Sequence, residues 1–178
     1  MLVSPEPRSK RTVEGDLGVY VNARHVIDYI GEKELRGEFT SFDEIVGTLS
    51  PYPANDEASR FSARLGRYCF ETSVRRHAGY IRQMYGPTGR IEVAQGKDLT
   101  AIKSIVGTGG LLSRSRYTRQ IIDNAKSLSG NHSKELLPGP DVRIYRDRNY
   151  IFAAIGLIST VDASLATDLI DSALEELQ

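Results

Sequence analysis

The run Gly107-Thr108-Gly109-Gly110 is the stretch of the sequence whose residue types and spacing are best suited to chemistry. It follows the β-branched residues Ile105 and Val106, which predict a short buried strand. Glycine accepts positive φ and has no Cβ, so the backbone after the strand can turn sharply and lie flat against a ligand. A helical pattern over residues 117–126 comes soon afterwards.

A strand, a glycine turn and a helix in this order place backbone N–H groups and a positive helix end at the carboxyl edge of a sheet. Such a place suits a phosphate or a nucleotide. We therefore predict that Gly107, Thr108, Gly109 and Gly110 form a nucleotide-binding turn. A tight strand-to-helix turn that binds nothing has the same pattern, and a lone glycine-rich turn does not separate the two readings.

Other reactive residue types give weaker patterns. Asp16 lies near two glycines and could bind Mg²⁺ or orient water, although a turn aspartate is the simpler reading. Cys69 falls on the apolar side of a predicted helix, where a small core residue is more common than a nucleophile. Three histidines, His25, His77 and His132, lack the ligand spacing of a zinc site. We therefore assign no catalytic residue and no metal ligand.

Composition indicates a globular domain. The chain has 178 residues, of which 40% are hydrophobic and 26% are charged, so we expect one domain over 1–178. Lys plus Arg equals Asp plus Glu at 23 each, which gives no electrostatic case for nucleic acid or an anionic membrane. One cysteine excludes an internal disulfide and favours the cytoplasm. No apolar run approaches the ~20 residues of a membrane helix.

The elements that must position the glycine turn form an α/β pattern. Residues 103–158 read as strand, helix, strand, helix, which predicts parallel strands and a layered sheet with flanking helices. The other expected elements are an extended lead-in over 1–12, a bent strand or hairpin over 12–21, helices over 23–30 and 41–49, a long helix over 56–85, a strand over 90–94, a strand over 141–145, and helices over 151–158 and 162–177.

Local signals refine these elements. Asn22 is expected to cap the helix at 23–30, and Ser41 with Glu44 forms a capping-box pattern. Asp147 or Asn149 is expected to cap the helix that follows them. Gly156 lies inside that helix, which predicts close packing against another backbone.

Several blocks resemble a known family. The glycine turn after a strand resembles the adenosine motif of actin-like ATPases, and Tyr150–Leu157 resembles their late small-residue helix, which packs on the other lobe. More narrowly, the chain resembles the glutamate mutase accessory proteins of the GlmL/MutL type. The blocks that carry this likeness are Lys10–Gly18, Gly96–Thr100, Ile105–Gly110 and Asn149–Leu157.

The resemblance implies the second lobe of an actin-like ATPase fold, which is related to ribonuclease H, with a possible helical insertion over 22–85. It implies ATP or ADP with Mg²⁺ as the cofactor of the full-length family protein. It also implies a chaperone or reactivation role beside the subunits of an adenosylcobalamin-dependent glutamate mutase.

The resemblance also implies a missing half. Family members are longer, and we expect their first lobe and both phosphate motifs upstream of Met1. The block Glu14–Gly18 superficially resembles the second phosphate motif, but it runs into Val19 and Tyr20 and not into small hydroxyl residues. This chain is then the C-terminal lobe alone, and we expect weak or absent nucleotide binding and no ATPase activity from it.

Two questions stay open at this level. Arg60 and Arg64 are weak candidates for adenine contact by family likeness, although a solvated charged face explains them as well. No role is assigned to Lys103, Arg114 or Arg116. The alternative function is a non-catalytic interaction module that docks on a mutase or forms a homodimer, because a lobe without its partner exposes apolar surface.

Overall fold

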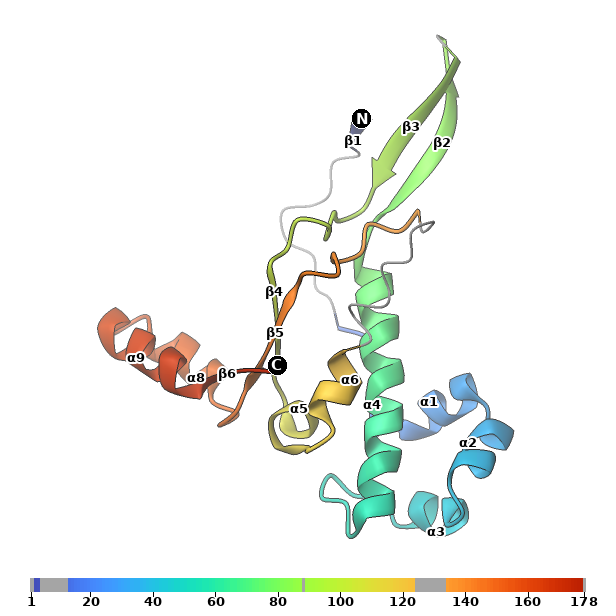
Figure 1. The fold of residues 1–178 in the computed structure, drawn as a ribbon, viewed down its shortest axis with the longest axis vertical. Coiled ribbons are helices and arrows are strands. Elements are labelled where there is room, and N and C mark those ends of the chain that lie inside the picture. The colour runs from blue at the N-terminus through green and yellow to red at the C-terminus, as the bar shows by residue number, and fades with distance from the viewer. Residues whose placement is uncertain (1, 4–12, 88, 124–133, 178) are drawn as a thin grey trace.

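The computed structural model describes residues 2–3, 13–87, 89–123 and 134–177. One long helix, α4 (Asp56–His77), runs through the middle of the molecule (Figure 1). Asn55 caps it, since its side-chain oxygen accepts a hydrogen bond from the N–H of Ala58 at 2.8 Å. Acidic residues in the first turn and basic residues in the last turn complement the helix dipole. The remaining elements are arranged around this helix.

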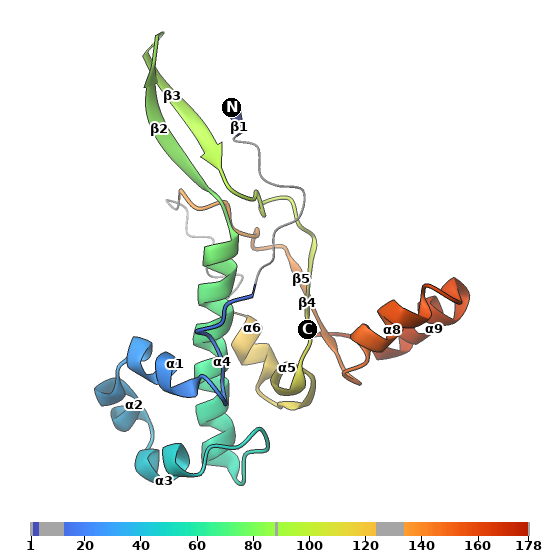
Figure 2. The same ribbon diagram turned by 180° about the vertical axis from the view of Figure 1, so that it is seen from behind.

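Three short helices cover one side of α4: α1 (Ala23–Ile30), α2 (Glu32–Glu38) and α3 (Phe42–Gly47) (Figure 2). Their apolar faces pack on Phe61 and Leu65 of α4, both fully buried. The predicted helix at 23–30 is confirmed, and it ends at Gly31 with φ 103°. The second of the three helices was not predicted.

Asn22 and Ser41 occupy the predicted N-cap positions, but neither side chain makes the expected capping hydrogen bond. The side-chain amide of Asn22 donates instead to the carbonyl of Gly15 at 2.6 Å, and Ser41 makes no side-chain capping bond. The strand or hairpin expected over 12–21 is also wrong over the described residues 13–21, which form turns and coil. Two glycines and the Asn22 contact favour this folded-back loop over an extended strand.

The other side of α4 carries α5 (Gly110–Arg114), α6 (Thr118–Ile122) and a three-stranded sheet (Figure 1). The sheet order is β4 (Ser104–Gly107), β5 (Arg143–Asp147) and β6 (Leu174–Glu176). β4 and β5 are parallel, as predicted, and Gly107 pairs with Arg146. Ile121, Ile122 and Ile144 pack with Ala63 in a core between helix and sheet.

The helix predicted over 117–126 is present as α6, and its expected last residues, 124–126, lie outside the described residues. A separate short helix, α5, begins at Gly110 and was not predicted. It follows the glycine turn directly, so the turn enters a helix sooner than expected.

The second sheet is a projecting hairpin. β2 (Tyr80–Gly86) pairs antiparallel with β3 (Gly89–Gln95), and β1 (Leu2–Val3) adds to β3 in parallel (Figure 1). The helix predicted to reach Tyr85 is therefore wrong beyond His77. Tyr80, Ile81 and Tyr85 have helix-like spacing, but strand pairing with β3 overrides it. Apart from Leu2 and Val3, the expected lead-in over 1–12 lies outside the described residues.

The chain ends in a helical hairpin of α8 (Phe152–Ile158) and α9 (Ala163–Ala173), which extends away from the body (Figures 1 and 2). Its small core contains Ile155 and Ala166. The predicted helix to Leu177 stops at Ala173, because the next three residues pair with β5 as strand β6. The close packing predicted for Gly156 is wrong, since a Cβ there would meet nothing within 4 Å among the described residues.

In the described part of the chain, none of the helices combines the length and the apolar character needed to span a bilayer.

Candidate functional site

Residues 107–110, called the glycine ledge below, leave the carboxyl end of β4 and enter α5. Gly107 is buried, whereas Thr108 and Gly110 are exposed. Gly109 has φ +98°, a conformation that residues with a Cβ rarely adopt. The predicted strand and turn are therefore confirmed, but the strand is not buried as predicted, because Val106 is 41% exposed and Ile105 is only half-buried. The ledge keeps an open face. Whether it binds a nucleotide stays a prediction.

Two cavities flank the ledge. The larger, of about 700 Å³, lies between Gly110 and the loop before α4. The smaller, of about 440 Å³, lies between Thr108–Leu112, the middle of α4 and the loop over residues 14–19. Leu111 lines both. The ledge thus forms a wall shared by two hollows, each of a size that can hold part of a small ligand.

The larger cavity is lined by aromatic and guanidinium groups. The guanidinium of Arg114 lies 5.7 Å from the ring centroid of Tyr52, and its Nη1 donates to the Tyr52 hydroxyl at 3.3 Å. Tyr150 lines the same cavity with φ 56°, an uncommon value for a residue other than glycine. Faces of this kind stack on planar, electron-rich rings.

Asp56 supplies the acidic group of this cavity. It forms an ion pair with Arg116, and the hydroxyl of Tyr117 donates to its Oδ1 at 2.6 Å. Arg114 and Arg116, to which the sequence assigned no role, both line the cavity. The sequence could not predict these contacts. Arg114 and Arg116 lie about 60 residues after Tyr52 and Asp56, and no local sequence pattern relates residues so far apart.

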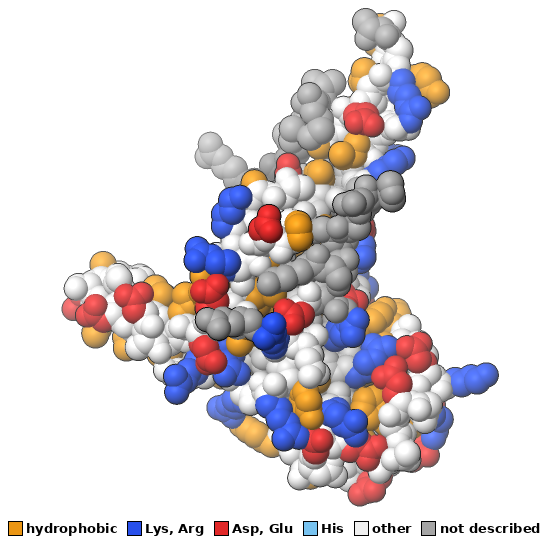
Figure 3. All heavy atoms as spheres, viewed as in Figure 1, with side chains coloured by type: hydrophobic (Ala, Val, Ile, Leu, Met, Phe, Trp, Pro, Cys, Tyr) orange, Lys and Arg blue, Asp and Glu red, His pale blue; other side chains and the backbone are white. Residues whose placement is uncertain are grey.

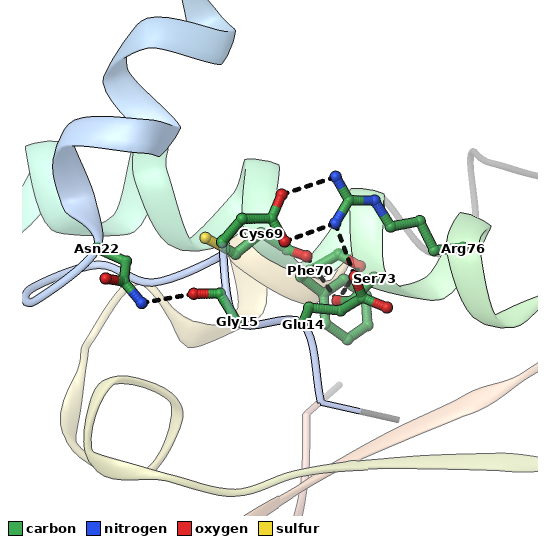
Figure 4. A network of polar contacts seen from close by, with 8 residues as sticks. Glu14, Gly15, Asn22, Cys69, Phe70, Ser73 and Arg76 are labelled. Atoms are coloured by element: carbon green, nitrogen blue, oxygen red, sulfur yellow. Dashed lines mark hydrogen bonds and ion pairs between the residues drawn. The ribbon is translucent and has the colours of Figure 1, made fainter. Parts of the chain in front are cut away.

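The smaller cavity is bordered by an ion-pair network on α4 (Figure 4). Arg76 Nη1 donates to Glu14 Oε2 at 2.7 Å and to Asp16 Oδ1 at 2.8 Å, and its Nη2 donates to Asp16 Oδ2 at 2.9 Å. These hydrogen bonds hold the pKa of Asp16 at about 2. Asp16 lies in a turn, as predicted, and the network fixes the loop over residues 14–18 onto α4.

One carboxylate lies directly behind the ledge. Asp147 is fully buried at the carboxyl end of β5. Its Oδ2 accepts from the hydroxyl of Thr108 at 2.8 Å and from the N–H of Phe152 at 3.0 Å, and its Oδ1 accepts from the N–H of Ile151 at 3.0 Å. Burial alone would raise its pKa, but these hydrogen bonds outweigh burial and keep the pKa below the ordinary value.

Asp147 therefore accepts hydrogen bonds from the N–H groups at the start of α8, as predicted for a capping residue, although Ile151 occupies the N-cap position. Its contact with Thr108 was missed. A signal for it existed. Adjacent parallel strands end at the same sheet edge, so residues that follow β4 and β5 had to be neighbours there.

The structure does not bring Arg60 and Arg64 to the ledge. Arg64 forms ion pairs with Glu34 at 2.6 Å and with Glu38 at 3.1 Å, while Arg60 lies 3.8 Å from Asp56. Both border a separate cavity of about 180 Å³ that lies between α4, α6 and the end of α2. They fit the charged-face reading.

Cys69 is partly buried against the core of α1–α4, and burial raises the pKa of its thiol to about 11. A thiol in this state is a poor nucleophile, in agreement with the predicted core role. Within the described ranges, no three His, Cys, Asp or Glu residues are grouped closely enough to hold a metal ion.

Comparison with known proteins identifies the family. The family model described as MutL protein matches residues 1–174. Protein MutL of Clostridium tetanomorphum is 32% identical over 177 residues, which cover 95% of this chain and 36% of that relative. The chain thus spans little more than a third of the length of the curated relative that it matches. No solved structure matches the chain. The chain belongs to the MutL protein family, the glutamate mutase accessory proteins.

Proposed function

We propose that this chain is the nucleotide-binding lobe of an actin-like ATPase that serves an adenosylcobalamin-dependent glutamate mutase as a chaperone or reactivation factor. Family membership supports the link to the mutase. The glycine ledge supports the nucleotide, because it leaves the carboxyl end of a parallel strand, where ligands of α/β sheets bind. With its single cysteine, the chain fits the reducing cytoplasm in which such a mutase would work.

The ledge carries this proposal. A Cβ built on Gly110 would meet no atom within 4 Å, so the backbone there is open to a ligand. A phosphate or ribose can approach such a backbone closely. The larger cavity then receives the base, with Tyr52 and Tyr150 as aromatic faces and Arg114 as a stacking guanidinium.

Magnesium would enter with the phosphates of ATP or ADP. Mg²⁺ keeps several waters and binds one or two carboxylates together with substrate phosphates. The ledge itself carries no carboxylate, and Asp147 behind it already accepts three hydrogen bonds. We therefore expect the remaining ligands and the phosphate motifs from a first lobe, and we expect this chain to bind nucleotide weakly.

Titration with ADP and Mg²⁺, followed by amide chemical shifts and calorimetry, tests the site. Gly110→Val adds a side chain to the ledge without a clash or a positive φ, so it blocks the ligand and spares the fold. Gly37→Ala on α2, also in open space and far from the ledge, is the matched control. We expect shifts over residues 107–112 that Gly110→Val abolishes and Gly37→Ala keeps. If Gly110→Val binds ADP with the same affinity as wild type, the nucleotide does not bind at the glycine ledge.

The second candidate function, an interaction module, is favoured by the α8–α9 hairpin. Figure 3 shows hydrophobic and acidic side chains together on it. Residues 149–178 contain five carboxylates and neither Lys nor Arg. Its exposed large apolar side chains are Leu157, Val161, Leu165 and Ile170. Apolar patches of this kind mark association sites, which is why a homodimer or a docked mutase subunit is the alternative.

Size-exclusion chromatography with light scattering tests whether the hairpin surface forms a homodimer. A dimer that Leu157→Asp and Val161→Asp convert to monomer supports self-association through the hairpin. A chain that is monomeric at every concentration contradicts the homodimer.

A further inference from the structure

Among the described residues, Asp147 is the one Asp, Glu, Lys or Arg that is buried. Its side chain is fully enclosed, whereas the ion pairs of the described chain lie at least partly in solvent. Burying a carboxylate costs free energy unless hydrogen bonds compensate it. The residues that donate these hydrogen bonds therefore indicate which parts of the fold the buried carboxylate holds together.

The compensating donors come from two separate segments. One is the hydroxyl of Thr108 in the glycine ledge, at 2.8 Å. The others are the N–H groups of Ile151 and Phe152 at the start of α8, both at 3.0 Å. The carboxylate itself ends β5. Three elements that meet at one sheet edge are thus held by a single side chain.

We propose that Asp147 is the positioning residue of the glycine ledge, and that through Thr108 it fixes the ledge to the start of the α8–α9 hairpin. Thr108 is exposed and stands between Gly107 and Gly109. Its hydroxyl bond to a buried carboxylate, at 2.8 Å, is charge-assisted, and bonds of that class are about twice as strong as neutral ones. The ledge is then rigid where a ligand would touch it.

The hairpin depends on the same carboxylate for its direction. α8 packs on α9, and their shared core contains Ile155, Ala166 and Ala173. The hairpin is joined to the sheet through β5 and β6, where the N–H of Arg148 donates to the carbonyl of Ala173 at 2.9 Å. Asp147 holds the first N–H groups of α8 at that junction. A displacement of Thr108 would therefore also shift Asp147 and the first residues of α8, where the hairpin begins.

Thr108→Val tests this link, because it removes the hydroxyl and keeps the shape of an exposed side chain. We expect the amides of Ile151 and Phe152 to exchange with solvent about tenfold faster, since one of the bonds that hold Asp147 in place is lost. Thr108→Ser restores the hydroxyl and should return exchange to within about twofold of wild type. Thr100→Val is the matched control, since Thr100 also donates to a carboxylate, that of Asp98 at 2.6 Å, but away from the ledge.

Asp147→Asn approaches the same link from the other side. This substitution should speed the hydrogen exchange of the amides of residues 108–110 as well as that of the Ile151 and Phe152 amides. Unchanged exchange at Ile151 and Phe152 in Thr108→Val, or the same change in Thr100→Val, would overturn the role of Asp147.

The expected effect on ADP binding rests on the proposed nucleotide site, and it is measured independently of amide exchange. We expect Thr108→Val to weaken ADP binding about fivefold to tenfold and Thr108→Ser to recover it. If wild type binds no ADP but the exchange results hold, the proposed function fails and the positioning role stands. If ADP binds and Thr108→Val changes neither exchange nor affinity, the positioning role fails and the nucleotide site stands.

Discussion

Arg76 and Asp16 form a two-bond ion pair across 60 residues of sequence, with N···O distances of 2.8 and 2.9 Å. Fork-to-fork pairing of this kind is the strongest geometry available to arginine and a carboxylate. It pins the loop over residues 14–18 onto α4, where that loop lines the cavity beside the glycine ledge. Together with the hydrogen bond from Asn22 to Gly15, this pair keeps the loop at the border of the candidate site.

Arg76→Gln should return the pKa of Asp16 from about 2 toward its ordinary value of 3.8. The folded-state pKa is depressed, so the pair stabilises the protein above about pH 4 and loses this effect as the pH falls toward 2. Denaturation at pH 6 should show Arg76→Gln less stable than wild type, and the gap should narrow near pH 2.5. A carboxyl ¹³C titration gives the pKa directly. A gap of constant size across this range would contradict the pairing.

Gly79 is expected to tolerate no side chain. A Cβ there would lie 2.5 Å from the carbonyl oxygen of Gln95 and 2.7 Å from the carbonyl carbon of Gly96, and backbone atoms of a paired strand cannot move aside. Gly79→Ala should cost about 1–3 kcal/mol of folding free energy, in the range of overpacked sites. Gly37→Ala, inside α2 with open space around it, should be neutral or stabilise by up to about 1 kcal/mol. Urea denaturation measures the free energy of unfolding of the two variants. An equal change in both variants would refute the prediction for Gly79.

Helix-like spacing explains why β2 was missed. Tyr80, Ile81, Met84 and Tyr85 recur at three- and four-residue steps, as the residues of α4 do. Only pairing with β3, a tertiary contact, makes them a strand. β6 was missed for the same reason, since three residues at the end of an apolar helical pattern pair with β5.

The glycine ledge and the two parallel strands beside it were predictable, because strand residues, turn glycines and helix periodicity are local signals. The contacts that complete the site are not local. Arg114 meets Tyr52 across 62 residues, and Thr108 meets Asp147 across 39. Spacing along the chain carries no information on such pairs until the sheet order and the place of α4 are known.

Cys69 should label slowly with iodoacetamide. With a thiol pKa of about 11, its thiolate fraction at pH 8 is about a hundredfold lower than that of an ordinary cysteine. Labelling in the folded protein should be slower by about that factor, and in urea it should reach the rate of a free thiol. Mass spectrometry of the alkylated chain follows both rates. Fast labelling of the folded chain would mean that the thiol is activated, against its place beside the core of α1–α4.

ATP hydrolysis should be absent from this chain alone. Phosphoryl transfer needs Mg²⁺ held beside the phosphates, donors around the γ-phosphate and an oriented water. The ledge carries no carboxylate, and the carboxylate of Asp147 behind it already accepts three hydrogen bonds, so the proposed site offers no free carboxylate for Mg²⁺ beside the ledge. We expect phosphate release equal to that of Gly110→Val, which blocks the ledge and serves as the background. Turnover that requires Mg²⁺, exceeds this background and disappears in Gly110→Val would show that one lobe holds a complete site, and the division of the site between two lobes would then be wrong.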